Sequence, residues 1–403
     1  MRLEAVSAVL DRRLLSSSQA PLAVGLSGGG DSLALLLIAD QWARAHGRRL
    51  LVLTVDHGLN PLSAEWTARC GRIAGELGWD FRALAWTGDK PTTGLPAAAR
   101  RARHALLADA ARKEGAKVIL LGHTADDLAE GAAMRDEGSS VSDPREWSPS
   151  PAWPQGRGVF LLRPMLGLRR AQIRDWLRAQ GRDWIDDPAN EDRRFARSRA
   201  RAASPSLVQA AEVAAEEAVA EPLAARWGLL NLPRTLSARS LAAACLSAAG
   251  TDVPPRGERL ERVMALVRGG EPFTATLAGA RIEGLDDRVL IARNAGEAAR
   301  GGLAESPLAP GVEIVWDGRF EITASQPGLS VAALRGHASR LPKSERDALK
   351  AVPALARPSL PVILHADKSV TCPLLDGETP VRVRALAAER HSAACGLTTR
   401  EPG

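Results

Sequence analysis

Hydrophobic and polar positions follow two alternating patterns through residues 1–135. Short, almost continuous apolar runs predict buried strands at 21–26, 50–55, 81–86 and 117–121. Between these runs, longer segments carry apolar residues at helical spacing and predict helices at 32–46, 63–77 and 96–115. Because strands that are largely apolar alternate with helices, we expect an α/β fold with a parallel, doubly wound sheet covered on both faces.

The pattern changes after residue 135. Residues 136–158 are rich in Ser, Pro, Gly and Trp without any period, which predicts a long loop. A strand and an amphipathic helix are then expected at 159–162 and 169–180. The later sequence predicts helices at 205–250 and 257–268, then short strands between 273 and 383. We therefore expect an α/β domain at 1–203, a smaller helical or linker region at 204–300 and an α+β region at 301–403.

Net charge and cysteine spacing indicate the kind of partner and the cellular compartment to expect for this chain. Its 403 residues carry a formal net charge of +6, which favours an anionic partner such as nucleic acid, although a mild excess is common in soluble proteins. None of the four cysteines is in CxxC spacing with another, which argues against a disulfide framework or a zinc knuckle and fits a reducing cytoplasm.

Two further features argue against export or membrane insertion. Residues 1–15 mix charged and apolar positions and predict an amphipathic helix, not a signal peptide. The longest apolar run, 33–39, is far shorter than the ~20 residues of a membrane-spanning helix, so we expect no membrane segment.

A glycine-rich loop joins the first strand to the following helix, with the sequence Ser27-Gly28-Gly29-Gly30-Asp31-Ser32. Consecutive glycines let backbone amides approach an anion, and the helix N-terminus behind them adds partial positive charge, so the loop is suited to phosphate. Asp31 is the unexpected member, because a carboxylate repels phosphate unless a cation lies between them; we therefore expect Mg²⁺ at Asp31. The simpler alternative is a glycine-rich turn with an Asp–Ser helix cap.

This loop matches neither common nucleotide fingerprint. It lacks the G-x-x-x-x-G-K-[ST] pattern of Walker A loops, and its glycines are consecutive, unlike those of the dinucleotide fingerprint. The strand–SGGxDS–helix arrangement instead resembles the PP-loop superfamily. That resemblance implies an enzyme that cleaves ATP between the α and β phosphates and transfers AMP, with ATP and Mg²⁺ as cofactors.

Further polar segments follow the predicted strands at the edge where a parallel sheet binds its ligands. Val55 and His57 end the second strand, and His123 to Glu130 follow the strand at 117–121. The second of these segments contains two adjacent carboxylates and has the sequence His123-Thr124-Ala125-Asp126-Asp127-Leu128-Ala129-Glu130. Asp127 and Glu130 are three residues apart and share a helix face, as do Arg100 and Arg103. The Asp126–Asp127 pair also suits an ordinary helix start.

Together these segments resemble the tRNA(Ile)-lysidine synthase family. Supporting segments are Arg163-Pro164-Met165-Leu166, Asp186-Asp187-Pro188-Ala189-Asn190, Phe195-Ala196-Arg197 and Trp316-Asp317-Gly318-Arg319-Phe320. The resemblance implies that ATP activates carbon-2 of the wobble cytidine in an isoleucine tRNA with a CAU anticodon. L-lysine then displaces AMP. It also implies a possible homodimer, and tRNA binding by the 301–403 region.

The resemblance assigns roles to individual residues. The 27–32 loop, Val55, His57 and Arg100 would bind ATP, and Asp31 would hold the metal. Asp31, Arg103 and Asp127 would be catalytic, with Arg103 neutralising developing charge. Lysine would be bound by Asp127, Glu130 and His123. The tRNA would contact Arg193, Arg194, Arg197, Arg199 and Arg201, although such a charge run can also be a solvated face.

Some positions depart from the pattern, and two other functional classes stay open. Thr124, Gly131 and Ser198 stand where the family commonly has His, Thr and Asn, which affects the lysine and cytidine contacts. One alternative is another PP-loop adenylating enzyme that modifies tRNA. The other is a non-catalytic nucleotide- or RNA-binding protein, against which the intact Asp31 and the Asp126–Asp127 pair argue. Trp316 is expected to be a core residue.

Overall fold

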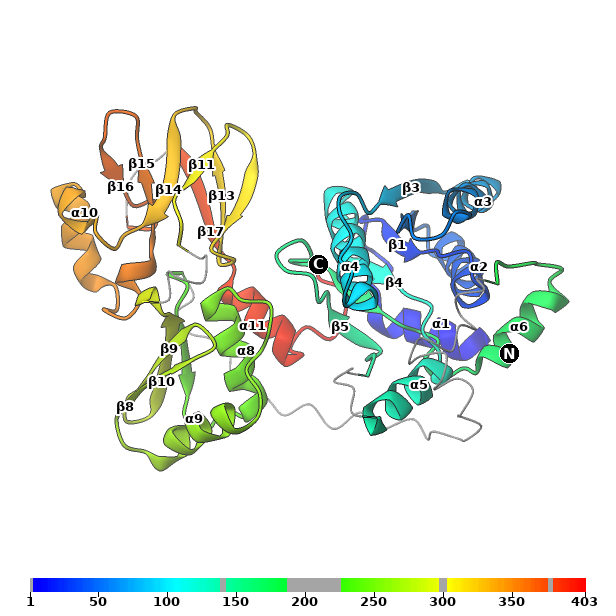
Figure 1. Ribbon diagram of the computed structural model, residues 1–403, viewed down its shortest axis with the longest axis horizontal. Coiled ribbons are helices and arrows are strands. Elements are labelled where there is room, and N and C mark those ends of the chain that lie inside the picture. Colours follow the sequence, from blue (N-terminus) through cyan, green and yellow to red (C-terminus); the bar gives the residue numbers. More distant parts are fainter. Residues whose placement is uncertain (1–2, 138–142, 187–225, 297–302, 376–379) are drawn as a thin grey trace. The chain divides into compact units, whose positions relative to one another are not determined.

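The computed structural model describes residues 3–137, 143–186, 226–296, 303–375 and 380–403 (Figure 1). The chain divides into two compact units, Met1–Glu216 with Thr398–Gly403, and Glu217–Leu397. The boundaries expected at residues 203 and 300 both lie outside the described residues. Within the described ranges, no helix is long and apolar enough to cross a membrane.

The first unit contains a six-stranded sheet in the order β3-β2-β1-β4-β6-β5. Its strands are β1 (Leu22–Gly25), β2 (Leu50–Asp56), β3 (Asp80–Ala85), β4 (Val118–Leu120), β5 (Trp147–Pro149) and β6 (Phe160–Leu162). All neighbours pair in parallel except β5, which runs antiparallel to β6 at the edge. The expected parallel α/β sheet is therefore confirmed, with one antiparallel edge strand.

Helices cover both faces of this sheet. They are α1 (Leu3–Arg13), α2 (Gly30–Ala45), α3 (Ser63–Glu76), α4 (Leu95–Lys113), α5 (Ala125–Asp136) and α6 (Arg170–Ala179). Alternate strand residues point to opposite faces. Thus Leu22 and Val24 pack in a core with α1, α2, α3 and α6, whereas Ala23 packs in a second core with α4. Burial on both faces explains why β1, β4 and β6 lack polar positions.

The second unit combines three antiparallel sheets with helices. One four-stranded sheet has the order β7-β10-β9-β8, formed by β7 (Leu230–Pro233), β8 (Phe273–Leu277), β9 (Ala280–Gly284) and β10 (Arg288–Arg293). Helices α8 (Ala238–Ala249) and α9 (Glu258–Gly269) pack with it around a core of its own.

The remaining strands form two further sheets. One has the order β11-β14-β15-β16, formed by β11 (Ser306–Leu308), β14 (Leu329–Ala333), β15 (Pro361–Leu364) and β16 (Val370–Thr371). The other has the order β12-β13-β17, formed by β12 (Glu313–Trp316), β13 (Phe320–Ala324) and β17 (Val381–Ala385). The remaining helical elements of the second unit are α10 (Lys343–Ala348), three 3₁₀ turns at Ala338–Arg340, Leu349–Ala351 and Arg357–Ser359, and α11 (Ala387–Cys395), whose Ala387 packs in the core of α8 and α9. Trp316 is buried, as expected.

Two expectations about secondary structure were wrong. Helix was expected from 205 to 250, but Leu230–Pro233 forms strand β7, because it pairs with β10 and buries Leu230 and Leu232. A loop was expected throughout 136–158, but Trp147–Pro149 forms strand β5. In both cases the strand is short and depends on a partner distant in sequence, so local patterns carry little signal for it.

Candidate active site

The glycine-rich loop follows β1 and opens helix α2, as predicted. Gly28 has a φ of +83°, a left-handed conformation that favours glycine. The Ser32 hydroxyl lies 3.1 Å from the Ser27 amide and donates to the Gly29 carbonyl at 2.9 Å, so it fixes the curl of the loop from inside. The loop therefore has the compact shape and helix N-terminus that suit phosphate.

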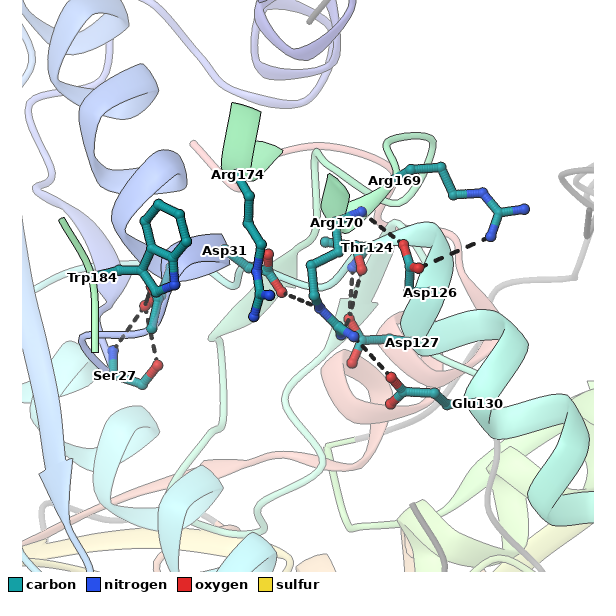
Figure 2. Close-up of polar contacts among 12 residues, drawn as sticks. Ser27, Asp31, Thr124, Asp126, Asp127, Glu130, Arg169, Arg170, Arg174 and Trp184 are labelled. Carbon is teal, nitrogen blue, oxygen red and sulfur yellow. Dashed lines mark hydrogen bonds and ion pairs between the residues drawn. The ribbon is translucent and has the colours of Figure 1, made fainter. Parts of the chain in front are cut away.

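A segment that sequence reasoning missed lies against this loop. The Ile185 amide donates to the Gly28 carbonyl at 2.9 Å, and a Cβ atom at Gly28 would come within 2.4 Å of the Ile185 side chain. The Trp184 ring, labelled in Figure 2, would lie 3.4 Å from a Cβ atom at Gly30. Glycine at positions 28 and 30 is thus matched to this covering segment as well as to phosphate. Motif spacing gave no sign of the contact, because it joins residues more than 150 positions apart.

Three carboxylates converge beside the loop on one arginine. We call Asp31, Asp127 and Glu130 the acid cluster. Arg170, the first residue of α6, donates from Nε to Asp31 Oδ2 at 3.0 Å and from Nη1 to Glu130 Oε1 at 3.0 Å (Figure 2). Its Nη2 lies 3.7 Å from Asp127 Oδ2. The structure brings the predicted acids together around a cation that the sequence analysis did not identify.

Burial and ion pairing oppose each other at Asp31 and Arg170. Burial raises the pKa of Asp31 above its ordinary value, and the charge and hydrogen bond of Arg170 oppose part of this rise. Burial alone would disfavour the charged guanidinium, but the carboxylates of Asp31 and Glu130 outweigh it and raise the pKa of Arg170. Arg170 is therefore a permanent positive charge within the acid cluster.

The carboxylate of Asp31 is suited to bind the expected Mg²⁺ ion. Its Oδ1 atom is buried and accepts no hydrogen bond from any residue that the structure describes, so an oxygen suited to a hard cation is available. The described ranges contain no group of three or more His, Cys, Asp or Glu side chains arranged to hold a metal ion. A Mg²⁺ ion at Asp31 would then take most of its ligands from phosphate and water, as Mg²⁺ commonly does.

Asp126 and Asp127 also have structural tasks. Asp127 Oδ2 accepts from the backbone amide of Thr124 at 2.8 Å and from its hydroxyl at 3.1 Å, forming a capping box at the start of α5. Asp126 Oδ2 accepts from the Arg170 amide at 2.8 Å. Thr124, one of the departures from the family pattern, is fully buried and serves as the N-cap of this helix. Asp127 therefore also stabilises the start of α5, and Asp126 stabilises the start of α6.

Positive charges gather at the same strand ends around α4. We call Arg100, Arg103 and Arg163 the basic group. Burial and then Arg103 lower the pKa of His57, while burial followed by Arg103, Arg100 and Arg163 lowers the pKa of His104 to about 2. Burial, with Arg100 and Arg103 adding to it, lowers the pKa of Arg163 to about 10. Arg100 and Arg103 therefore lie near enough to Arg163 to add to the effect of burial on its pKa, and a concentration of positive charge of this kind suits an anion.

The predicted residues therefore fall into distinct neighbourhoods. Asp31, Asp127 and Glu130 form the acid cluster, whereas His57, Arg100 and Arg103 belong with the basic group. Val55 is half-buried at the carboxyl end of β2, and His123 follows β4 and is one of the groups that lower the pKa of His104. The predicted tRNA contacts, together with Ser198, lie outside the described residues: Arg193, Arg194, Arg197, Arg199 and Arg201.

The amino-acid sequence of this chain is similar to those of several known proteins. A family profile described as a PP-loop domain matches residues 4–206. A tRNA(Ile)-lysidine synthase of Caulobacter vibrioides is 54% identical, over 100% of this chain and 99% of the relative. A tRNA(Ile)-lysidine synthase of Hyphomonas neptunium is 35% identical, over 84% of this chain and 95% of the relative. The relative from Rhizobium meliloti, also a tRNA(Ile)-lysidine synthase, is 33% identical over 81% and 79% of the two chains.

The similarity to these relatives is not confined to the PP-loop domain. The Caulobacter match runs through both compact units, so it includes the strands and helices that follow residue 206. This chain belongs to the tRNA(Ile)-lysidine synthase family of PP-loop proteins.

Proposed function

We propose that this chain adenylates carbon-2 of the wobble cytidine in an isoleucine tRNA with a CAU anticodon and then joins L-lysine to that carbon. The products are lysidine, AMP and pyrophosphate. The observation that carries the proposal is the acid cluster beside the glycine-rich loop, which sets cation-binding carboxylates next to a phosphate-binding backbone. This combination suits a reaction between a nucleotide and a cationic amine.

The first step needs ATP held with its α phosphate open to attack. The glycine-rich loop and the N-terminus of α2 would bind the phosphates through backbone amides. When bound at Asp31, Mg²⁺ would neutralise phosphate charge. In the basic group, Arg100 would bind ATP, and Arg103 would offset negative charge that develops on the departing pyrophosphate or would stabilise the adenylated base. The cytidine oxygen forms a bond to the α phosphorus as the α–β phosphoanhydride bond breaks.

The second step needs lysine as a free amine. Asp127 and Glu130 would bind its ammonium groups, with His123 beside them, and Asp127 would accept a proton, because an amine with a pKa of about 10.4 must lose one before it attacks. The lysine nitrogen then bonds to carbon-2 while the bond from carbon-2 to the AMP oxygen breaks. Asp127 is held by its capping bonds through Oδ2, which fixes the orientation of this base.

Other parts of the proposal concern partners and setting. Arg193, Arg194, Arg197, Arg199 and Arg201 would contact tRNA phosphates, and the 301–403 region would add tRNA contacts. The absence of any CxxC pair supports a cytoplasmic setting. We also propose that two copies of this chain can associate as a homodimer.

The decisive experiment mixes the protein with ATP, Mg²⁺, labelled lysine and isoleucine tRNA with a CAU anticodon. AMP, pyrophosphate and labelled tRNA should appear together, and omission of tRNA should stop all three. Pyrophosphate release that depends on tRNA without lysine incorporation would instead point to another PP-loop tRNA-modifying enzyme. If no pyrophosphate is released and no lysine is incorporated, the result would favour a nucleotide- or RNA-binding protein. Asp127→Asn, which retains a capping oxygen, should lose lysine incorporation while still folding.

A further inference from the structure

We infer that Arg170 is a positioning residue that holds Asp31 and Glu130 in one fixed arrangement, so that the ATP side and the lysine side of the reaction depend on each other. The inference rests on the proposed function, which places ATP at Asp31 and lysine at Glu130. Neither the motifs nor the composition identified Arg170.

The geometry of the contact supports this role. Arg170 reaches Asp31 and Glu130 from two nitrogens of the same guanidinium, each at 3.0 Å (Figure 2). A guanidinium is planar and rigid, so two bonds from one group define the separation of the two carboxylates. Asp31 comes from α2 and Glu130 from α5, and their hydrogen bonds to Arg170 join these two elements.

The position of Arg170 is fixed by a backbone hydrogen bond and by the packing of its helix. Its backbone amide donates to Asp126 at 2.8 Å, which ties the start of α6 to the start of α5. The same helix buries Ile173 and Leu177 in the core of the sheet, so its position is set by packing. The Arg170 side chain is only 16% exposed. An arginine anchored in this way positions its partners instead of following them.

Charge balance explains why a cation is needed. Three carboxylates lie around Arg170, and buried carboxylates repel one another unless a cation separates them. Arg170 engages Oδ2 of Asp31, whereas Oδ1 accepts no hydrogen bond from the described residues. The guanidinium can therefore hold the carboxylate without covering the oxygen that would face a metal ion.

A shared positioning residue predicts a specific kinetic signature. Loss of a residue that served only the metal side would raise the KM for ATP alone, and loss of one that served only the lysine side would raise the KM for lysine alone. Loss of Arg170 should raise both. Arg170→Lys keeps the positive charge. An ammonium group is a compact charge on a flexible stem, however, so it cannot hold both carboxylates at a fixed separation.

The test compares Arg170→Gln, Arg170→Lys and a control, Arg82→Gln, in the full-length protein. Arg82 lies on β3, is exposed and pairs with Glu114 at 3.1 Å. The KM values for ATP and for lysine are measured with isoleucine tRNA, and binding of a nonhydrolysable ATP analogue is measured separately by calorimetry. Thermal unfolding of each variant reports folding.

We expect Arg170→Gln to raise both KM values about tenfold or more and to weaken analogue binding similarly, with Arg170→Lys between it and the wild type. Arg82→Gln should change each value less than about twofold. A change in only one KM, or a fall in kcat alone, would overturn the inference. If Arg170→Gln does not fold, the same two KM values of Arg170→Lys decide the question. A wild-type protein that incorporates no lysine would refute the proposed function instead.

Discussion

Gly122 lies against the backbone of Asp31, at the point where the strand β4 ends. A Cβ atom on residue 122 would come within 3.0 Å of the Asp31 carbonyl carbon and oxygen and of the Ser32 amide nitrogen. Backbone atoms at the start of a helix cannot move aside as a flexible side chain can. The glycine therefore allows the segment after β4 to approach the phosphate-binding loop closely.

Gly122→Ala should impair ATP use, because the added methyl group pushes Asp31 out of position. We expect binding of a nonhydrolysable ATP analogue to weaken at least about tenfold and the free energy of unfolding to fall by about 1–3 kcal/mol. Calorimetry with an ATP analogue and urea unfolding measure the two effects. Gly75→Ala is the matched control, since a Cβ atom there meets nothing within 4 Å. Unchanged ATP binding in Gly122→Ala would contradict this interpretation of the contact.

A buried ion pair joins the last residues of the chain to the first unit. Arg48 Nη2 lies 2.9 Å from Glu401 Oε1, and both side chains are 1% exposed. Glu401→Gln leaves the arginine buried without its counter-charge, so we expect a loss of about 3–5 kcal/mol of stability by urea unfolding. Glu114→Gln, which breaks the exposed pair with Arg82, should cost less than about 1 kcal/mol. Equal effects of the two variants would show that burial of the pair is unimportant.

Asp317 explains the Trp-Asp-Gly-Arg-Phe motif in structural terms. Its carboxylate pairs with Arg319 at 2.7 Å and with Arg293 at 3.3 Å, and all three side chains are almost fully buried. Asp317→Asn should therefore destabilise the second unit by about 3–5 kcal/mol, because two buried cations lose their counter-charge. The comparison is Asp347→Asn, in an exposed pair with Lys350. Hydrogen exchange of β12 and β13 would report the loss; unchanged protection would rule it out.

His391 makes the stability of the second unit depend on pH. Burial lowers the pKa of His391 from 6.5 to about 4, between the Ser240 hydroxyl and the Cys395 thiol. Between these pH values the unfolded chain binds a proton that the folded chain does not, so the free energy of unfolding falls as pH falls. The loss reaches about 3 kcal/mol near pH 4.

Urea unfolding at a series of pH values measures this dependence. His391→Gln, which cannot titrate, should flatten the slope between pH 6.5 and 4 regardless of its own stability. His337→Gln, at a less buried position beside Arg340, provides the comparison. A slope in His391→Gln equal to that of the wild type would assign the pH dependence to other groups.

Much of the first unit could be predicted from local sequence. The strands at 22–25, 50–56 and 118–120 and helices α2, α3, α4 and α6 lie where the apolar patterns placed them. The glycine-rich loop was recognised because its residues are contiguous. The same holds for the Asp126–Asp127 pair after β4. Contiguous motifs on a parallel sheet must meet at one edge, which is why Asp31, Asp127 and Glu130 could be expected at the same edge from the sequence alone.

Features that depend on distant pairings were missed. Strands β5 and β7 are short, and each is stabilised by a partner strand that local sequence does not identify. Trp184 and Ile185 cover the glycine-rich loop through packing and one backbone bond, neither of which leaves a periodic pattern.

The residue types and spacing determined which chemistry this chain can hold: glycines and a helix start for phosphate, carboxylates for cations and arginines for anions. Tertiary structure alone decided how these groups are paired. It set Arg170 between Asp31 and Glu130, and it used Asp127 to cap α5 while keeping it in the acid cluster. The physical reason is that charge–charge interactions depend on distances of a few ångströms, which the packing of α2, α5 and α6 defines and a linear sequence does not.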